Sequence, residues 1–152
     1  MIYTISKSPK SLLGEVRLPA SKSESNRALL IQALSQKKFS IANLSEANDT
    51  LVLKNILENH HQENHFDVGP SGTAMRFLTA FFATIPGTRT LTGSARMKER
   101  PLGLLVDALR KLGANITYLE KEGYPPLKIE GANLSGGSIS IDGSMSSQYL
   151  SA

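Results

Sequence analysis

The sequence predicts an α/β or α+β domain built from repeated βαβ-type units. Two observations support this fold class. Short segments with the alternating pattern of strands are followed by apolar segments at helical spacing, and this order occurs twice along the chain. A seven-residue pattern, with a small residue first, a long polar donor fifth and leucine seventh, occurs at residues 23–29, 72–78 and 144–150. An internal repeat outweighs local predictions when a fold class is chosen.

Two short strands and a helix are predicted at the start of the chain. Residues 2–6 and 15–18 alternate between apolar and polar side chains, with proline and glycine between them, and this pattern is typical of strands joined by a turn. Residues 21–26 form a hydroxyl-rich helix start, and residues 28–34 are apolar nearly all round. A helix of this composition is expected to be buried.

The next elements complete a first unit. The apolar positions of residues 39–44 predict a strand, after which Asp49 can cap a helix over residues 51–57. His61 and His65 have an i,i+4 spacing that suits zinc ligands. The sequence offers no confirmed third ligand beside them, so no metal site is predicted.

A loop of small residues over positions 69–73 opens directly into an apolar helix. The unpaired backbone N–H groups of such a helix start have little side-chain bulk in front of them and suit an anion. Arg76 follows in the first turns, where the helix dipole alone would favour an acidic residue. This combination predicts a phosphate or carboxylate partner. The three copies of the pattern predict that several helix N-termini converge on one polyanionic ligand.

The second unit repeats the order of elements. Residues 88–92 alternate like a strand, Pro101 suits the first position of a helix, and apolar residues at helical spacing follow until Gly113 ends that helix. Further strands are predicted at residues 116–118, 127–129 and 139–141. A third helix starts near residue 146 and the chain stops within it. We therefore expect a piece of a longer protein, with apolar surface that the missing part would cover.

The composition excludes several classes of protein. The chain of 152 residues is 40% hydrophobic and 20% charged, as globular proteins are, and it lacks the ~20 consecutive apolar residues of a membrane span. It has no cysteine, which excludes disulfides and a cysteine nucleophile. The first residues lack a signal-peptide pattern, which predicts a cytoplasmic protein. Scattered Lys and Arg residues give a net charge of +4, which favours small anionic metabolites over nucleic acid.

Several motifs, in order and over nearly the whole chain, resemble the family of 3-phosphoshikimate 1-carboxyvinyltransferase, or EPSP synthase. They lie at residues 21–30, 72–76, 96–103, 105–109, 124–127 and 143–148. The family protein is much longer, so the chain resembles roughly its first third. The resemblance implies the enolpyruvyl transferase fold, an inside-out α/β barrel of repeated βαβαββ units with buried parallel helices, here truncated in the third unit.

The resemblance also implies a division of the chain. Residues 1–20 are expected to be N-terminal strands that belong to, or cross toward, the other half of the full enzyme. Residues 21–152 would form an incomplete substrate-binding domain. Its first unit would cover about 21–68, its second about 69–142, and the start of the third 143–152.

The activity that the resemblance implies belongs to aromatic amino acid and chorismate biosynthesis. The enzyme would transfer the enolpyruvyl group of phosphoenolpyruvate to the 5-hydroxyl of shikimate 3-phosphate and release phosphate, with no metal or organic cofactor. Its partners would be these two small molecules, and neither nucleic acid nor a membrane. The parent enzyme is expected to be a monomer. The isolated chain is expected to self-associate through exposed apolar surface.

Matching the family's motifs residue by residue assigns the substrate-binding residues. Shikimate 3-phosphate would be held by Lys22, Ser23, Arg27, Ser146, Ser147 and Gln148. Phosphoenolpyruvate would be held by Lys22, Gly72, Arg100 and Gln148. Arg76 and Thr73 are supporting candidates. The family's acid/base carboxylates would lie in the part that follows this chain, so no catalytic residue is assigned and the chain alone is expected to be inactive.

Two other functions remain open. A related UDP-N-acetylglucosamine enolpyruvyl transferase would carry its usual catalytic cysteine within the region covered here, and the chain has none. A non-enzymatic anion-binding module would use the same helix starts. Taken singly, the serines of residues 21–25 are explained by helix capping, and the glycines of residues 69–72 by a turn. The order of the motifs favours the shikimate enzyme.

Overall fold

A computed structural model of the chain describes residues 3–6, 11, 13–35, 37, 39–142, 144 and 147–152. The described helices are α1 (Lys22–Leu34), α2 (Asn48–Asn59), α3 (Gly72–Thr84), α4 (Ala95–Lys98), α5 (Gly103–Lys111) and α6 (Gln148–Ser151). The described strands are β1 (His65–Asp67), β2 (Gly87–Thr92), β3 (Asn115–Tyr118) and β4 (Leu127–Gly131). None of these helices combines the length and the apolarity that crossing a bilayer requires.

The strands form one open sheet in the order β1-β2-β4-β3. β1 and β2 are parallel, and β4 runs antiparallel to both β2 and β3. In chain order, β1, α3, β2, α5, β3 and β4 make one βαβαββ succession, with the short helix α4 inserted before α5. The predicted mixed α/β class is therefore confirmed, and the sheet does not close into a barrel.

Helix α3 is the centre of the core. Its residues are apolar on nearly every side, and Met75, Phe77, Leu78, Phe81 and Phe82 are almost fully buried. The helix contacts β2 and β4 of the sheet and also the helices α1, α2, α5 and α6. Burial of each large apolar side chain contributes about 1.5–3 kcal/mol to folding. The position of the α3 N-terminus is thus fixed by packing on several sides.

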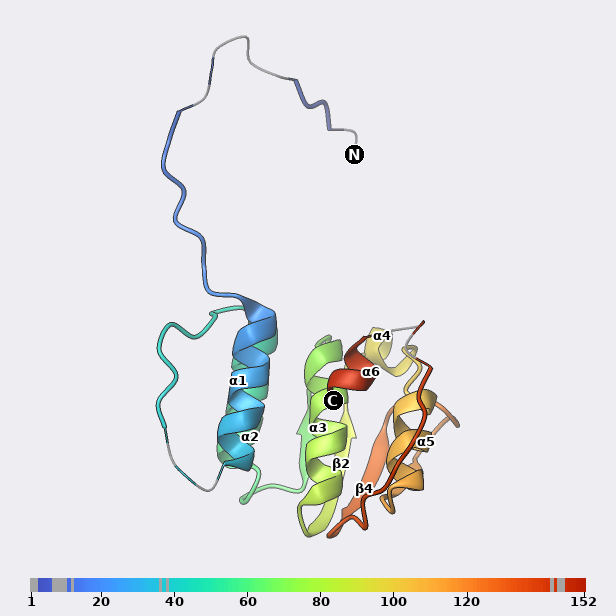
Figure 1. Cartoon of the computed structure of the whole chain (residues 1–152). Helices are drawn as coiled ribbons and strands as arrows, with labels where there is room; N and C mark the ends of the chain where they lie inside the picture. The colour runs from blue at the N-terminus through green and yellow to red at the C-terminus, as the bar shows by residue number, and fades with distance from the viewer. Residues whose placement is uncertain are drawn as a thin grey trace.

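The helices share a direction (Figure 1). Helices α1, α3 and α5 all begin at the upper end of the molecule in this view, and α6 lies at that end beside the start of α3. Because the backbone dipoles of parallel helices add at their N-termini, this end of the molecule is electropositive before any side chain is counted.

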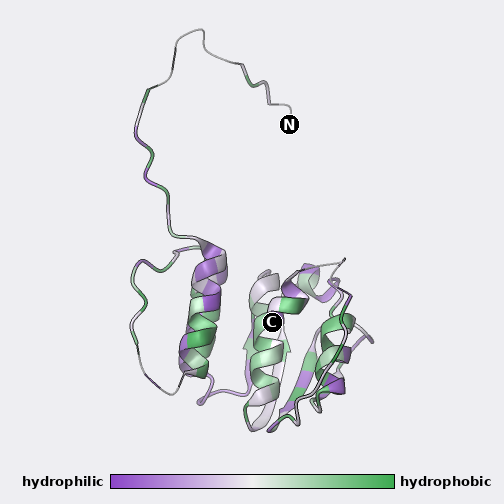
Figure 2. Ribbon diagram, in the orientation of Figure 1, coloured by the Kyte–Doolittle hydropathy of each residue, from purple (hydrophilic) through white to green (hydrophobic). Residues whose placement is uncertain are grey.

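Helix α1 is less buried than its sequence predicts. Among its apolar residues Leu29 is buried, whereas Ile31 is 62% exposed and Leu34 is 58% exposed. The hydropathy colouring of the ribbon shows mostly hydrophobic residues in the lower half of α1 (Figure 2). The prediction of a buried helix is wrong for this chain, because the described residues cover α1 only on the side that packs against α2 and α3.

Four predicted strands are not strands here. Described residues 3–6, 15–18, 39–44 and 139–141 carry no strand assignment; residue 2 lies outside the described part. Figure 1 shows the chain before α1 running away from the rest of the molecule. The apolar positions of these segments are spaced as in strands, but a strand also needs a neighbouring edge for its backbone hydrogen bonds. Within the described residues, no strand of the sheet pairs with them.

Two helix starts also differ from the prediction. Ala47 holds the N-cap position of α2, and Asp49 lies in the first turn, where it pairs with Lys22. α5 begins at Gly103, two residues beyond Pro101, because Leu102 has a non-helical backbone with φ −125°. The Leu102 amide donates to the Gly123 carbonyl instead. The predicted strands at residues 88–92, 116–118 and 127–129 are confirmed.

Candidate functional site

The loop before α3 leads into the first backbone amides of that helix, which have no acceptor within the helix. Gly69 has the left-handed φ of 57°, and its amide donates to the Asp67 carboxylate at 2.7 Å. Ser71 is the N-cap, and its Oγ accepts from the Ala74 amide at 3.2 Å. Within the described residues, the amides of Gly72 and Thr73 have no such acceptor and suit an anion.

Two arginines converge on Gly72. A Cβ built at Gly72 would lie 2.6 Å from Nη1 of Arg100 and 3.0 Å from Nη1 of Arg76. Arg76 lies one turn into α3, whereas Arg100 comes from the segment between α4 and α5. In the described part of the chain neither guanidinium forms an ion pair with a carboxylate. Their charges therefore add to the helix dipole at this point.

Gln148 brings the third repeat to the same place. Arg76 Nη1 donates to Gln148 Oε1 at 3.0 Å, and Gln148 Nε2 donates to Thr73 Oγ1 at 3.2 Å. The next residue, Tyr149, is buried beneath the Arg76 guanidinium, whose Cζ lies 5.1 Å from the ring centroid. The Tyr149 hydroxyl donates to the Pro101 carbonyl at 2.8 Å. Helix α6 is thus attached to α3 and to the segment that carries Arg100.

The start of α1 lies on the other side of α3. Arg27 Nη1 donates to the Ser23 carbonyl at 3.1 Å, and its Nη2 donates to Ser151 Oγ at 3.4 Å. The Arg27 Cζ also lies 5.9 Å from the Phe77 ring centroid. Arg27 therefore connects the first repeat to α3 and to α6.

Lys22 is held by an acidic residue of α2. Its Nζ donates to Asp49 Oδ2 at 2.9 Å, with the lysine side chain 49% exposed and the carboxylate 22% exposed. An anion that binds Lys22 must share the ammonium group with Asp49 or displace it. A partly exposed ion pair of this kind contributes about 0–1 kcal/mol, so this exchange costs little.

The predicted residues thus fall into two groups. Gly72, Arg100 and Gln148 lie together around the start of α3. Lys22, Ser23 and Arg27 lie on α1, and Arg27 is linked to Gln148 through the Ser151 hydroxyl. Ser147 occupies the N-cap position of α6 and makes no side-chain cap bond. Ser146 lies outside the described residues. Sequence reasoning missed Tyr149, whose contacts with Arg76 and Pro101 leave no signature in the motif.

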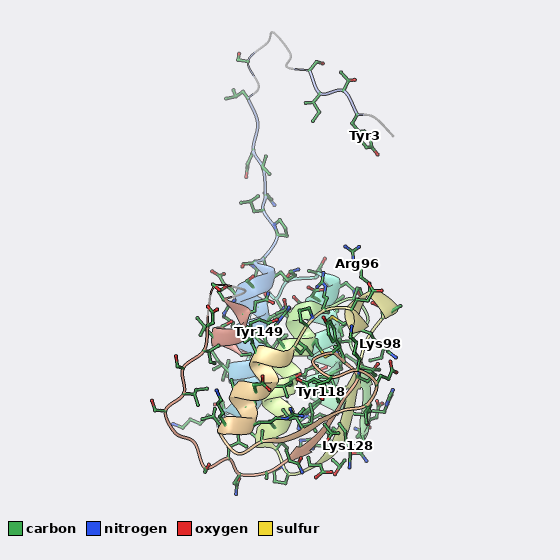
Figure 3. All side chains as sticks on the ribbon, turned by 90° about the vertical axis from the view of Figure 1, so that its right-hand side faces the viewer. Tyr3, Arg96, Lys98, Tyr118, Lys128 and Tyr149 are labelled. Atoms are coloured by element: carbon green, nitrogen blue, oxygen red, sulfur yellow. The ribbon has the colours of Figure 1, made fainter. Side chains whose placement is uncertain are left out.

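A hollow beside Arg100 extends this end of the molecule. It is lined by Pro70, Ser94, Arg96, Met97 and Arg100. Figure 3 shows Arg96 projecting outward at the same end as the start of α1. No cluster of three or more His, Cys, Asp or Glu side chains that could hold a metal occurs among the described residues. His61, considered above as a zinc ligand, instead lies against the ring of His60.

Comparisons with known proteins give a consistent result. The family model for EPSP synthase (3-phosphoshikimate 1-carboxyvinyltransferase) matches residues 6–62 and 57–152. A 3-phosphoshikimate 1-carboxyvinyltransferase of Bacteroides fragilis is 48% identical over 152 residues, which are 100% of this chain and 36% of the relative. The same enzyme of a Sulfurovum species is 49% identical, over 91% of this chain and 38% of the relative. The chain spans about a third of the length of these curated relatives.

Solved structures agree on the fold. Two structures of EPSP synthase from Acinetobacter baumannii superpose with TM-scores of 0.79 and 0.81 at 22% and 23% identity. The superpositions cover 90% and 91% of this chain, and 36% and 37% of the solved chains.

Proposed function

The chain belongs to the EPSP synthase family, and from this premise we propose that its electropositive end is the part of an EPSP synthase active site that binds shikimate 3-phosphate and one side of phosphoenolpyruvate. The complete enzyme would transfer the enolpyruvyl group to the 5-hydroxyl of shikimate 3-phosphate and release phosphate. The observation that carries the proposal is the convergence of Gly72, Arg100 and Gln148, from separate motifs, at the start of one helix.

The chemistry of the two substrates requires such a site. Both are polyanions, and their mutual repulsion must be offset before their reacting atoms can approach. Backbone amides and guanidinium groups that are already oriented toward the ligand supply this stabilisation without reorganisation at the moment of reaction. Arginine is suited to the task because its planar donors match carboxylate and phosphate oxygens.

We assign the residues to ligands as the motifs predict. Lys22, Ser23 and Arg27 would hold shikimate 3-phosphate from α1, and Ser146, Ser147 and Gln148 would hold it from the third repeat. Lys22, Gly72, Arg100 and Gln148 would contact phosphoenolpyruvate. A site of this composition binds and orients its ligands, but contains no assigned acid or base, so this chain alone is expected to give no turnover.

Isothermal titration of the chain with shikimate 3-phosphate tests the proposal. Lys22→Ala and Arg27→Ala should each weaken binding about tenfold or more, since hydrogen bonds to charged groups contribute about 1.5–3 kcal/mol. Lys54→Ala is the matched control, because Lys54 pairs with Glu58 on the exposed side of α2. No binding by the wild-type chain, or binding that neither Lys22→Ala nor Arg27→Ala weakens, would contradict the proposal.

The same titration separates the alternatives. Equal affinity for inorganic phosphate and shikimate 3-phosphate would favour a non-enzymatic anion-binding module. A preference for UDP-N-acetylglucosamine would favour the related transferase. A cytoplasmic location, a monomeric parent enzyme and self-association of the isolated chain through its apolar surface stay predictions.

A further inference from the structure

We propose that Arg76 and Tyr149 form a positioning pair, which holds Gln148 beside Gly72 and Arg100 in the orientation that the ligand needs. That the ligand is shikimate 3-phosphate rests on the proposed function. The positioning of Gln148 does not, because it concerns contacts within the unliganded chain.

Arg76 determines which way the Gln148 amide faces. A guanidinium can only donate hydrogen bonds, so the group of Gln148 that meets Arg76 Nη1 at 3.0 Å must be the carbonyl oxygen. The NH₂ group is then directed to Thr73 Oγ1, at 3.2 Å, on the first turn of α3. With the amide fixed in this way, its donor end lies at the helix start where an anion would bind.

The same Arg76 nitrogen also ties this arrangement to the loop. Nη1 donates to the Gly72 carbonyl at 3.1 Å as well as to Gln148. Gly72 is buried, and its missing Cβ leaves the space that Nη1 of Arg76 and Nη1 of Arg100 occupy. A shift of Arg76 would therefore disturb both Gln148 and the space at Gly72 that the Arg100 guanidinium shares.

Tyr149 packs against the Arg76 guanidinium and also fixes the segment that carries Arg100. Its side chain is 5% exposed, its ring lies under the Arg76 Cζ at 5.1 Å, and its hydroxyl donates to the Pro101 carbonyl at 2.8 Å. Pro101 directly follows Arg100, so this bond anchors the segment that carries Arg100 to α6. Figure 3 shows Tyr149 on α6 at the upper end of the molecule.

Lysine could not replace Arg76 in this role. A lysine ammonium is a compact charge, and it cannot cover the Tyr149 ring while also donating to two acceptors in a fixed plane. Arg76→Lys keeps the positive charge and removes the geometry. It therefore separates positioning from simple electrostatic attraction.

The first test uses the unliganded chain and nuclear magnetic resonance. In Arg76→Lys, the side-chain NH₂ signals of Gln148 should move toward those of the exposed Gln62. Exchange of the amides of residues 150–152, which are hydrogen-bonded within α6, should accelerate. Tyr149→Phe should accelerate exchange in the same residues. The controls are Arg17→Lys, whose side chain is 93% exposed, and Tyr124→Phe; both should leave the Gln148 signals unchanged. Unchanged Gln148 signals in Arg76→Lys would overturn the proposal.

The second test is a double-mutant cycle on shikimate 3-phosphate affinity. Arg76→Lys should lower affinity about five- to tenfold in the wild-type background, and by less than about twofold in a Gln148→Ala background. Equal effects in both backgrounds would mean that Arg76 acts directly on the ligand, and would overturn the positioning role. A wild-type chain that binds no shikimate 3-phosphate would overturn the proposed function, and the unliganded signals would then decide on the pair.

Discussion

At the scale of single residues, glycine plays two different parts in this chain. Gly72 leaves room for the ends of two flexible arginine side chains, at 2.6 and 3.0 Å from a built Cβ. Gly131, in β4, instead leaves room for backbone, because its Cβ would meet the carbonyl oxygens of Ile85 and Phe82. The first glycine is therefore expected to serve binding, and the second to serve folding.

The same substitution at the two positions should separate these parts. Gly72→Ala should change the free energy of unfolding by less than about 1 kcal/mol, because the guanidinium groups can move aside. It should nevertheless weaken shikimate 3-phosphate binding, since the displaced groups are Arg76 and Arg100. Gly131→Ala should destabilise the chain by about 3 kcal/mol, because backbone cannot yield in the same way. Urea unfolding and calorimetric titration measure both quantities; an unchanged affinity in Gly72→Ala would contradict this account.

At the scale of helices and strands, the sequence predicts some elements well for identifiable reasons. Helix α3 has every local signal, with a small-residue loop, a serine cap at Ser71 and a continuous apolar run. Strands β2, β3 and β4 have the alternation and also lie beside one another in the sheet. Residues 15–18, 39–44 and 139–141 have only the alternation, and pairing with a distant edge cannot be read from local sequence.

The site shows the same limit. The repeat places Arg27, Arg76 and Gln148 at the same position of its three copies, which predicts that they act together. Gly72 and Arg100 are added to them by the resemblance to the family. The contacts that hold them are tertiary and have no sequence pattern. The bond from Tyr149 to the Pro101 carbonyl spans 48 residues, and the ion pair of Lys22 with Asp49 spans 27.

The C-terminal end of α2 gives a prediction about pH. His60 is buried there against His61 and Phe81, with its Nδ1 at 2.7 Å from the Leu57 carbonyl. Burial lowers the pKa of His60 below its ordinary value of 6.5; the Leu57 carbonyl opposes this change, and the charges of His61 and Arg89 add to it. The folded chain therefore disfavours protonation of His60. The contribution of neutral His60 to the free energy of unfolding is complete above about pH 6.5 and is lost as the pH falls through the lowered pKa.

Urea unfolding across this range checks the pH prediction. Between pH 7.5 and pH 5 the wild-type chain should lose more stability than His60→Gln, which has no titrating group at this position. His65→Gln is the control, because His65 is exposed on β1. Equal losses in the wild-type chain and in His60→Gln would contradict the prediction.

At the scale of the whole molecule, helix direction is the property that links fold and function. The sheet and the apolar core fix α3, and α1, α5 and α6 begin at the same end (Figure 1). Within the described residues, Arg27, Arg76 and Arg100 at that end form no ion pairs with acids, whereas Lys22 at the same end pairs with Asp49 and Lys54, Arg110 and Lys128 elsewhere also pair with acids. The charge of these three guanidinium groups is therefore kept available at the end where the helices begin.

The chain also leaves apolar surface open beside α3. One hollow is lined mainly by Leu30, Ile31, Leu34 and Phe77, next to Arg27. Another continues past Leu34 to Phe81, Leu109 and Leu112. This surface runs along α1 and α3 and meets the candidate binding site at Arg27, which lines the first hollow.

The most direct test of the central claim is to map where shikimate 3-phosphate binds on the ¹⁵N-labelled chain by nuclear magnetic resonance. We expect the largest amide shifts at Ser23, Gly72, Thr73 and Gln148, and little change in β3 at the far edge of the sheet. Shifts confined to the sheet, or scattered over surface lysines without a response at Gly72 and Gln148, would contradict the claim that the converging helix starts form the anion site.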